Sequence, residues 1–239
     1  MDRYLERNKI SQFILRIDLT PEVSVDFGKL AELLQNDYGS YRTELKVNFN
    51  VNVQTNEIKR QNFVSFNMGE TPNVTLKLET PERAIILTVL HYNNKSVYQE
   101  KLKNIISALK SINTEIKAQR IGMRYINVFN CPKQNDISKV INTSEAKSIN
   151  EALKKDGIAR AMIVHEFQRD SYMSRIQCGI PNKFYPSKIT CLDLVLDIDV
   201  YSTGVIGLDE WENSVEVYNH GAYDAFVDYT KESFRETLK

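Results

Sequence analysis

The chain has 239 residues, with 31 basic and 31 acidic side chains and a formal net charge of zero. Nucleic-acid-binding proteins usually carry a basic surplus, because phosphate contacts dominate their affinity, so the overall charge does not support a nucleic-acid partner. Hydrophobic residues make up 42% of the chain and charged residues 26%, which is typical of a globular protein and unlike a disordered one.

Cysteine usage and hydropathy favour a cytoplasmic protein. The three cysteines, Cys131, Cys178 and Cys191, are odd in number and none forms a CxxC motif, which is typical of reduced thiols. The first ten residues are too polar for a secretory leader, and no apolar run approaches the roughly 20 residues of a membrane span. We therefore expect no membrane association.

The first half of the chain alternates strand and helix patterns. Strict alternation of apolar and polar residues over 43–53 predicts a half-buried strand, and a turn containing Pro72 separates two later strands. Ser96 and Gln99 predict a capping box at the start of the clearest helix. The expected strands are 13–19, 43–53, 62–68, 74–78 and 84–92, and the expected helices are 25–36 and 96–112.

The second half repeats this order, with strands, two short helices and a long final helix in which Gly221 allows a bend. We predict an α+β fold with an antiparallel sheet or sheets and helices packed on one face, in a single domain over 1–239. The matching order predicts an internal duplication with halves at about 11–113 and 118–239. The expected strands are 120–130, 160–168, 171–179 and 190–202, and the expected helices are 136–141, 149–155 and 209–238.

The segment from Arg120 to Asn127, R-I-G-M-R-Y-I-N, resembles the signature of a sporadically distributed bacterial family of unknown function. The family pattern also has an I-D-V strand, here at Ile198, and a closing helix with a His, a Phe six residues later and a Thr, matching His220, Phe226 and Thr230. Met123 replaces the usual Leu, and Val128 stands where Arg is frequent. The resemblance implies a fold but no activity, and it suggests a mobile-element, toxin–antitoxin or phage-defence context.

Two predicted strands carry charged side chains that alternate with apolar ones. Arg120 and Arg124 share one face of 120–130, whereas Tyr125 and Asn127 lie on the other face of that strand. Asp193, Asp197 and Asp199 share one face of the strand that ends at Ser202. If these strands are neighbours, the arginines can bind a nucleotide or other anion, or the carboxylates can bind Mg²⁺ as in a phosphodiesterase or nuclease. Cross-strand salt bridges are the simpler interpretation.

Other residues offer weaker indications of a site. His220, which the family resemblance includes, completes a candidate ligand-binding set of Arg120, Arg124, Tyr125, Asn127, Asp197, Asp199 and His220. None of the histidines has a second ligand at metal-binding spacing, and nucleophile-elbow and phosphate-loop motifs are absent from the sequence, so we expect no metal and no cofactor. Aromatic residues in or near expected loops suggest a protein interface at Tyr172, Phe184 and Tyr185, or a platform for single-stranded nucleic acid, and the simpler interpretation is that these rings pack on the core.

These observations favour a non-enzymatic interaction or regulatory protein that acts through a protein partner or through self-association. The first alternative is a ligand-sensing domain that binds a nucleotide or other anion through Arg120 and Arg124. The second is a metal-dependent phosphodiesterase or nuclease that uses Asp193, Asp197 and Asp199. The sequence leaves an enzymatic role open but favours none, and it does not decide whether the Arg-bearing and Asp-bearing strands are adjacent.

Overall fold

A computed structural model of the chain describes residues 9–52, 57–71 and 73–239. These residues form one ten-stranded antiparallel sheet with the order β2-β3-β4-β5-β1-β6-β9-β8-β7, and the short β10 pairs with β6. The predicted α+β fold with an antiparallel sheet is confirmed. Its strands are β1 (Ile10–Leu19), β2 (Arg42–Asn52), β3 (Glu57–Thr71), β4 (Val74–Glu79), β5 (Ala84–Leu90), β6 (Lys117–Asn130), β7 (Ala161–Gln168), β8 (Tyr172–Ile180), β9 (Asp193–Ser202) and β10 (Ile206–Gly207).

The helices lie between and after these strands. The described helices are α1 (Phe27–Tyr38), α2 (Ser96–Ile112), α3 (Gln134–Val140), α4 (Thr143–Leu153), α5 (Trp211–Tyr229) and α6 (Glu232–Arg235), with short 3-10 turns at Leu208–Glu210 and Glu236–Leu238. None of them, within the described ranges, combines the length and apolar character that a membrane-crossing helix needs.

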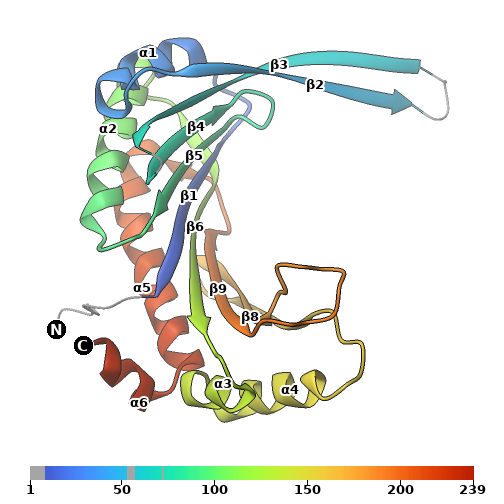
Figure 1. Ribbon diagram of the computed structural model, residues 1–239. Coiled ribbons are helices and arrows are strands. Elements are labelled where there is room, and N and C mark those ends of the chain that lie inside the picture. The colour runs from blue at the N-terminus through green and yellow to red at the C-terminus, as the bar shows by residue number, and fades with distance from the viewer. Residues whose placement is uncertain (1–8, 53–56, 72) are drawn as a thin grey trace.

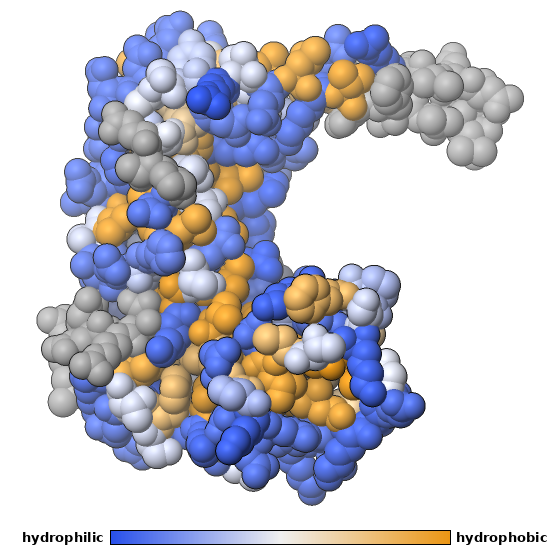
Figure 2. All heavy atoms as spheres, in the orientation of Figure 1, coloured by the Kyte–Doolittle hydropathy of each residue, from blue (hydrophilic) through white to orange (hydrophobic). Residues whose placement is uncertain are grey.

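The molecule has the outline of a C in Figure 1. Helices α1, α2 and α5 follow its outer side, and α3 and α4 lie at its lower end. The opposite face of the sheet lines the inside of the C, and the β2–β3 hairpin extends beyond the body as an arm. In Figure 2 the hollow is open, and hydrophilic residues cover much of its wall. The helices therefore leave one broad, curved face of the sheet uncovered in the part of the chain that the structure describes.

Alternation along the central strands decides which residues form the core. On β1, Phe13, Leu15 and Ile17 are at most 1% exposed and pack on the helix side, whereas Arg16 between them points to the uncovered face. Because neighbouring residues of a strand point to opposite faces, the same alternation separates core from polar residues on β6 and β9. The apolar side chains of the sheet thus pack with the helices into one core.

The two halves contribute to one sheet rather than to two. In each half the last long strand returns to pair with the first, β5 with β1 and β9 with β6, and the two first strands are antiparallel neighbours at the centre. This correspondence concerns the order of elements only, so an internal duplication of the sequence stays a prediction.

The predicted single helix over 209–238 is wrong. Helix α5 ends at Tyr229, and Thr230 is extended, with φ −110° and ψ 148°. The backbone there leaves the helix to pair with the α3–α4 connection: Thr230 forms a β-bridge with Ile141, and the Lys231 amide donates to the Val140 carbonyl at 2.9 Å. Tertiary pairing therefore overrides a helical pattern that continues through the sequence.

The predicted capping box at Ser96 is also wrong. Asn94 accepts the hydrogen bond of the Ser96 amide at 3.0 Å, and the Gln99 side chain donates instead to Glu216 on α5. Three predictions lie outside the described residues: the strand end at Val53, the turn residue Pro72 and the polar segment of residues 1–8.

Candidate functional site

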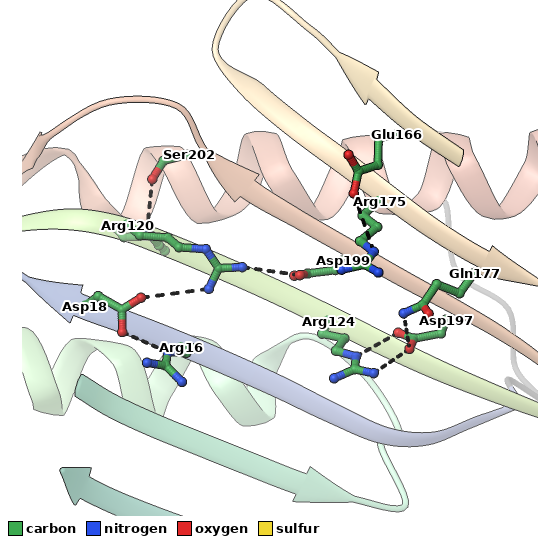
Figure 3. Close-up of polar contacts among 11 residues, drawn as sticks. Arg16, Asp18, Arg120, Arg124, Glu166, Arg175, Gln177, Asp197, Asp199 and Ser202 are labelled. Atoms are coloured by element: carbon green, nitrogen blue, oxygen red, sulfur yellow. Dashed lines mark hydrogen bonds and ion pairs between the residues drawn. The ribbon is translucent and has the colours of Figure 1, made fainter. Parts of the chain in front are cut away.

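Strands β6 and β9 are antiparallel neighbours. The Arg-bearing and Asp-bearing strands, whose adjacency the sequence did not decide, therefore lie side by side. Arg124 lies opposite Asp199, and Gly122 lies opposite Tyr201. All four residues belong to the alternating set that faces away from the helices, as Figure 3 shows for the charged ones. The register therefore brings the predicted arginines and carboxylates together on the uncovered face.

Arg124 and Asp197 form a bidentate ion pair diagonally across these strands. The Arg124 Nε and Nη2 atoms donate to the two Asp197 carboxylate oxygens at 2.8 and 2.5 Å. Gln177 on β8 lies on the other side of Asp197, with its Nε2 at 3.4 Å from Oδ2 (Figure 3). The hydrogen bonds that Arg124 donates to Asp197 raise the pKa of Arg124 more than its burial lowers it, so the guanidinium stays charged.

Arg120 lies flat on the sheet in a space that Gly122 leaves free. A Cβ atom on Gly122 would lie 3.1 Å from Cζ and from both terminal nitrogens of the Arg120 guanidinium. The Cζ atom is 4.6 Å from the centre of the Tyr201 ring, which is a cation–π geometry. Nη2 donates to Asp199 at 3.2 Å, and Nη1 is 3.9 Å from Asp18. We call Gly122, Tyr201 and Asp199 the Arg120 seat.

Flanking strands extend this arrangement into a ladder of charges. On β1 the Arg16 Nε donates to Asp18 at 2.7 Å, and on the opposite side Arg175 of β8 lies 3.5 Å from Glu166 of β7 (Figure 3). The ion pairs link equal numbers of cations and anions, which we call the charge ladder: Arg16, Arg120, Arg124, Arg175, Asp18, Asp197, Asp199 and Glu166. The ladder as a whole is neutral.

Two opposing influences act on the pKa of the Asp199 carboxyl: burial raises it and the nearby arginines lower it. Burial raises the pKa of its carboxyl more than Arg120 and Arg124 lower it. The arginines nevertheless lie close on both sides, so their charges offset much of the desolvation that an isolated carboxylate would face. Asp199 is thus a partly buried carboxylate that pairs with Arg120 at 3.2 Å.

Three of the predicted ligand-binding residues lie elsewhere. Tyr125 points to the helix side, where its hydroxyl donates to Asn219 at 2.8 Å and burial raises its pKa well above the usual value. Asn127 is also on the helix side and donates to the Leu196 carbonyl at 3.1 Å. His220 is on α5, beside Glu216 at 3.2 Å. The structure thus joins Arg120 and Arg124 with the aspartates and separates them from the rest of the predicted set.

The carboxylates of β9 are not grouped as metal ligands. Asp193 lies near Lys183 at 3.6 Å, and Asp197 and Asp199 are paired with arginines. Among the residues that the structure describes, no group of three or more His, Cys, Asp or Glu side chains is placed to hold a metal ion.

The predicted interface residues lie in two different environments: Tyr172 packs on a helix, whereas Phe184 and Tyr185 are exposed. Tyr172 packs against Tyr218 of α5, with ring centres 5.9 Å apart, and its hydroxyl approaches Gly221. Gly221 is therefore explained by this close contact, since α5 continues through it. Phe184 and Tyr185, in contrast, are 54% and 57% exposed in the segment between β8 and β9. We call residues 181–192 the aromatic loop.

A buried asparagine holds the aromatic loop in place. Asn182 is 7% exposed and has φ 59°, in the left-handed region that Asn tolerates better than most residues. Its Nδ2 donates to the carbonyls of Ala159 and Ser187 at 2.9 and 2.6 Å, and its Oδ1 accepts from the Phe184 amide at 3.1 Å. Sequence analysis missed this residue because its burial depends on the fold of the loop and on the contact with Ala159, 23 positions away.

The aromatic loop lies at the edge of the uncovered face. Lys183 reaches Asp193, which is on the same side of β9 as the charge ladder. The Arg160 guanidinium stacks on the Tyr185 ring, with Cζ 4.3 Å from its centre, and donates to the Pro181 carbonyl at 3.2 Å. The loop thus presents two exposed rings next to the hollow.

Sequence analysis also missed the ladder residues outside β6 and β9. Arg16 and Asp18 alternate with apolar residues on β1, as do Arg175 and the uncharged Gln177 on β8, so the signal was a polar side chain at every second strand position. That signal identifies a polar face but not which strands share it.

A scan against protein-family models and a search of curated proteins find no match to this chain. The resemblance carried by the segment from Arg120 to Asn127 therefore stays a prediction. Function has to be argued from the geometry of the uncovered face.

Proposed function

We propose that this protein is an interaction protein that binds a protein partner on the inside of the C. The observation that carries the proposal is the broad sheet face that the described helices leave uncovered, together with the charged side chains already ordered on it (Figure 3). A sheet with one face on the core and one face exposed is a common architecture, but a face this polar and this concave offers a large, shaped surface to a partner.

The charge ladder suits a protein surface better than a small anion. Each of its guanidinium groups already faces a carboxylate, so the ladder has no surplus charge to attract phosphate. Fixed charges of alternating sign favour a partner that presents the complementary pattern and exclude one that does not. Because the side chains are held before binding, little conformational entropy is lost when a partner docks.

The aromatic loop supplies the apolar contacts that charge alone does not. Tyr and Arg are enriched among the residues that contribute most to protein–protein affinity, and here Tyr185 stacks on Arg160. Phe184 is more than half exposed, although the hydrogen bonds of Asn182 hold its backbone. We therefore place the strongest partner contacts at this end of the hollow.

Site-specific photocross-linking tests the proposal in the cells that naturally make the protein. A photoreactive phenylalanine analogue replaces Phe184 in one variant and Lys103, which is exposed on the outer helix α2, in the control. We expect one discrete cross-linked protein from position 184 and none from position 103. The identified partner, once purified, should bind Phe184→Ala at least tenfold more weakly, as expected for a central aromatic contact.

Equal cross-linking from both positions, or none from position 184, would contradict the proposal. The double variant Arg124→Ala/Asp197→Ala serves as a second probe, because it removes an ion pair without leaving either charge unpaired. It should weaken partner binding while leaving the oligomeric state unchanged.

Binding of a nucleotide or other anion is the second candidate function. It is favoured by the outward position of Arg120 and Arg124, whose side chains keep 31% and 42% of their surface exposed. Titration with ATP or with inorganic phosphate would then raise the unfolding temperature of the wild-type protein but not that of Arg120→Gln. Under the protein-partner proposal neither compound changes the unfolding temperature.

A further inference from the structure

Strand β7 forms one edge of the sheet and is open along its outer side. In the described part of the chain it pairs only with β8. From Val164 to Gln168 every residue is exposed, although the His165 ring on the helix side still contacts Tyr229 of α5. A free edge of this kind presents unpaired backbone donors and acceptors to another strand.

The edge lacks the features by which proteins usually prevent strand pairing. Within Ala161–Gln168 there is no lysine, arginine or proline, and the only carboxylate is Glu166. Two apolar side chains are partly exposed, Val164 at 46% and Phe167 at 36%. The opposite edge strand β2, in contrast, begins with the alternating charges of the sequence R-T-E-L-K. Of the two edges, β7 is the one suited to take a partner strand.

We propose that β7 pairs antiparallel with β7 of a second copy of this chain, around a two-fold axis at His165. A two-fold axis perpendicular to a sheet keeps each side chain on its own face, so facing residues must be an even number of positions apart. With His165 facing itself, Ile163 faces Phe167 of the second copy on the helix side, and Val164 faces Glu166 on the uncovered side.

Charge complementarity and strand overlap together favour this register. Just beyond the two ends of β7, Arg160, which stacks on Tyr185, comes opposite Asp170 of the second copy, and this contact occurs twice. A shift that centres the axis on Glu166 would place two carboxylates face to face, which is destabilising. A shift that centres it on Val164 would place Arg160 opposite Gln168 and lose both charge pairs. A register centred on Ile163 would also pair opposite charges, Arg160 with Glu166, but it would overlap only residues 161–165 of the two strands, against 162–168 in the register centred on His165.

The resulting dimer has a functional consequence. Because the axis is perpendicular to the sheet, the uncovered faces of the two copies lie on the same side and form one continuous surface. The dimer does not depend on the proposed partner in the hollow. Loss of cross-linking at Phe184 and loss of the dimer are separate results that test separate proposals.

Analytical ultracentrifugation of the full chain over a range of about 1–100 μM tests the inference. We expect a monomer–dimer equilibrium in the wild-type protein. Val164→Glu places a carboxylate opposite Glu166 at both symmetric contacts and should raise the dissociation constant roughly tenfold, whereas Val164→Lys should leave it unchanged or lower it. This dependence on the sign of the charge separates a loss of pairing from a loss of folding.

Two further variants complete the experiment. Leu45→Glu, at an exposed position on the other edge strand, should leave the equilibrium unchanged. Asp170→Arg should weaken the dimer, and adding Arg160→Asp to it should restore the dimer. A protein that stays monomeric at 100 μM, or equal effects of Val164→Glu and Val164→Lys, would overturn the inference, and the edge would then be free for a strand of a different protein.

Discussion

A substitution at Gly122 tests whether the Arg120 guanidinium occupies the space above this glycine. In Gly122→Ala the added methyl group would lie 3.1 Å from the guanidinium, which is tighter than most Cβ contacts, so Arg120 has to move. Its displacement weakens the cation–π contact with Tyr201, worth about 0.5–1 kcal/mol at a partly exposed site. It also weakens the ion pair with Asp199, worth about 0.2–1 kcal/mol. Complete loss of both contacts would cost about 0.7–2 kcal/mol.

The same substitution has an opposing effect that is independent of Arg120. Alanine in a strand is favoured over glycine by about 0.5–1 kcal/mol, because glycine loses more backbone freedom on folding. Gly122→Ala alone should therefore change the free energy of unfolding by between a gain of about 0.3 kcal/mol and a loss of about 1.5 kcal/mol. In an Arg120→Ala background the contact is absent, and the substitution should stabilise the protein by about 0.5–1 kcal/mol.

Urea unfolding measures both effects. Trp211 is the only tryptophan and is fully buried, so its fluorescence reports global unfolding. The four proteins of the double-mutant cycle should give a coupling free energy of about 0.7–2 kcal/mol between positions 120 and 122. If Gly122→Ala has the same effect in both backgrounds, within about 0.5 kcal/mol, the guanidinium does not occupy the space above Gly122.

Three other substitutions test the surroundings of the site. Burial raises the pKa of Asp199, so the folded state binds the Asp199 proton more tightly than the unfolded state does. The free energy of unfolding of the wild type relative to Asp199→Asn should therefore fall as the pH rises from the ordinary Asp pKa of about 3.9 through the raised pKa. Urea unfolding across that pH range measures this difference, and a rise with pH would contradict the raised pKa. Tyr125→Phe leaves the side-chain Oδ1 of Asn219 without this donor and should lower the free energy of unfolding by about 1–2 kcal/mol, with an unchanged value as the contrary result. Gly221→Ala would place a methyl group 2.7 Å from the Tyr172 hydroxyl and should lower the unfolding temperature in spite of the better helix propensity of alanine, whereas a Tyr172→Ala background should turn this loss into a gain.

Local patterns predicted the elements of this fold well. The alternation of apolar and polar residues located the long strands to within a few residues, and the helix 96–112 agrees with α2 at both ends. These predictions succeed because the periods of 2 and 3.6 residues follow from the geometry of each element alone. The helix expected over 209–238 failed at Thr230, because a contact with Ile141, 89 positions away, determines the backbone there.

In the candidate site, too, some features follow from local sequence and others from contacts between distant residues. The sequence by itself determined that Arg120 and Arg124 share one face of a strand and that Asp197 and Asp199 share one face of another, since side-chain direction in a strand depends only on position. Only the tertiary structure decided that these faces are the same face of one sheet, in a register that pairs Arg124 with Asp197. Strand order and register depend on contacts between residues more than 70 positions apart, which no local pattern records.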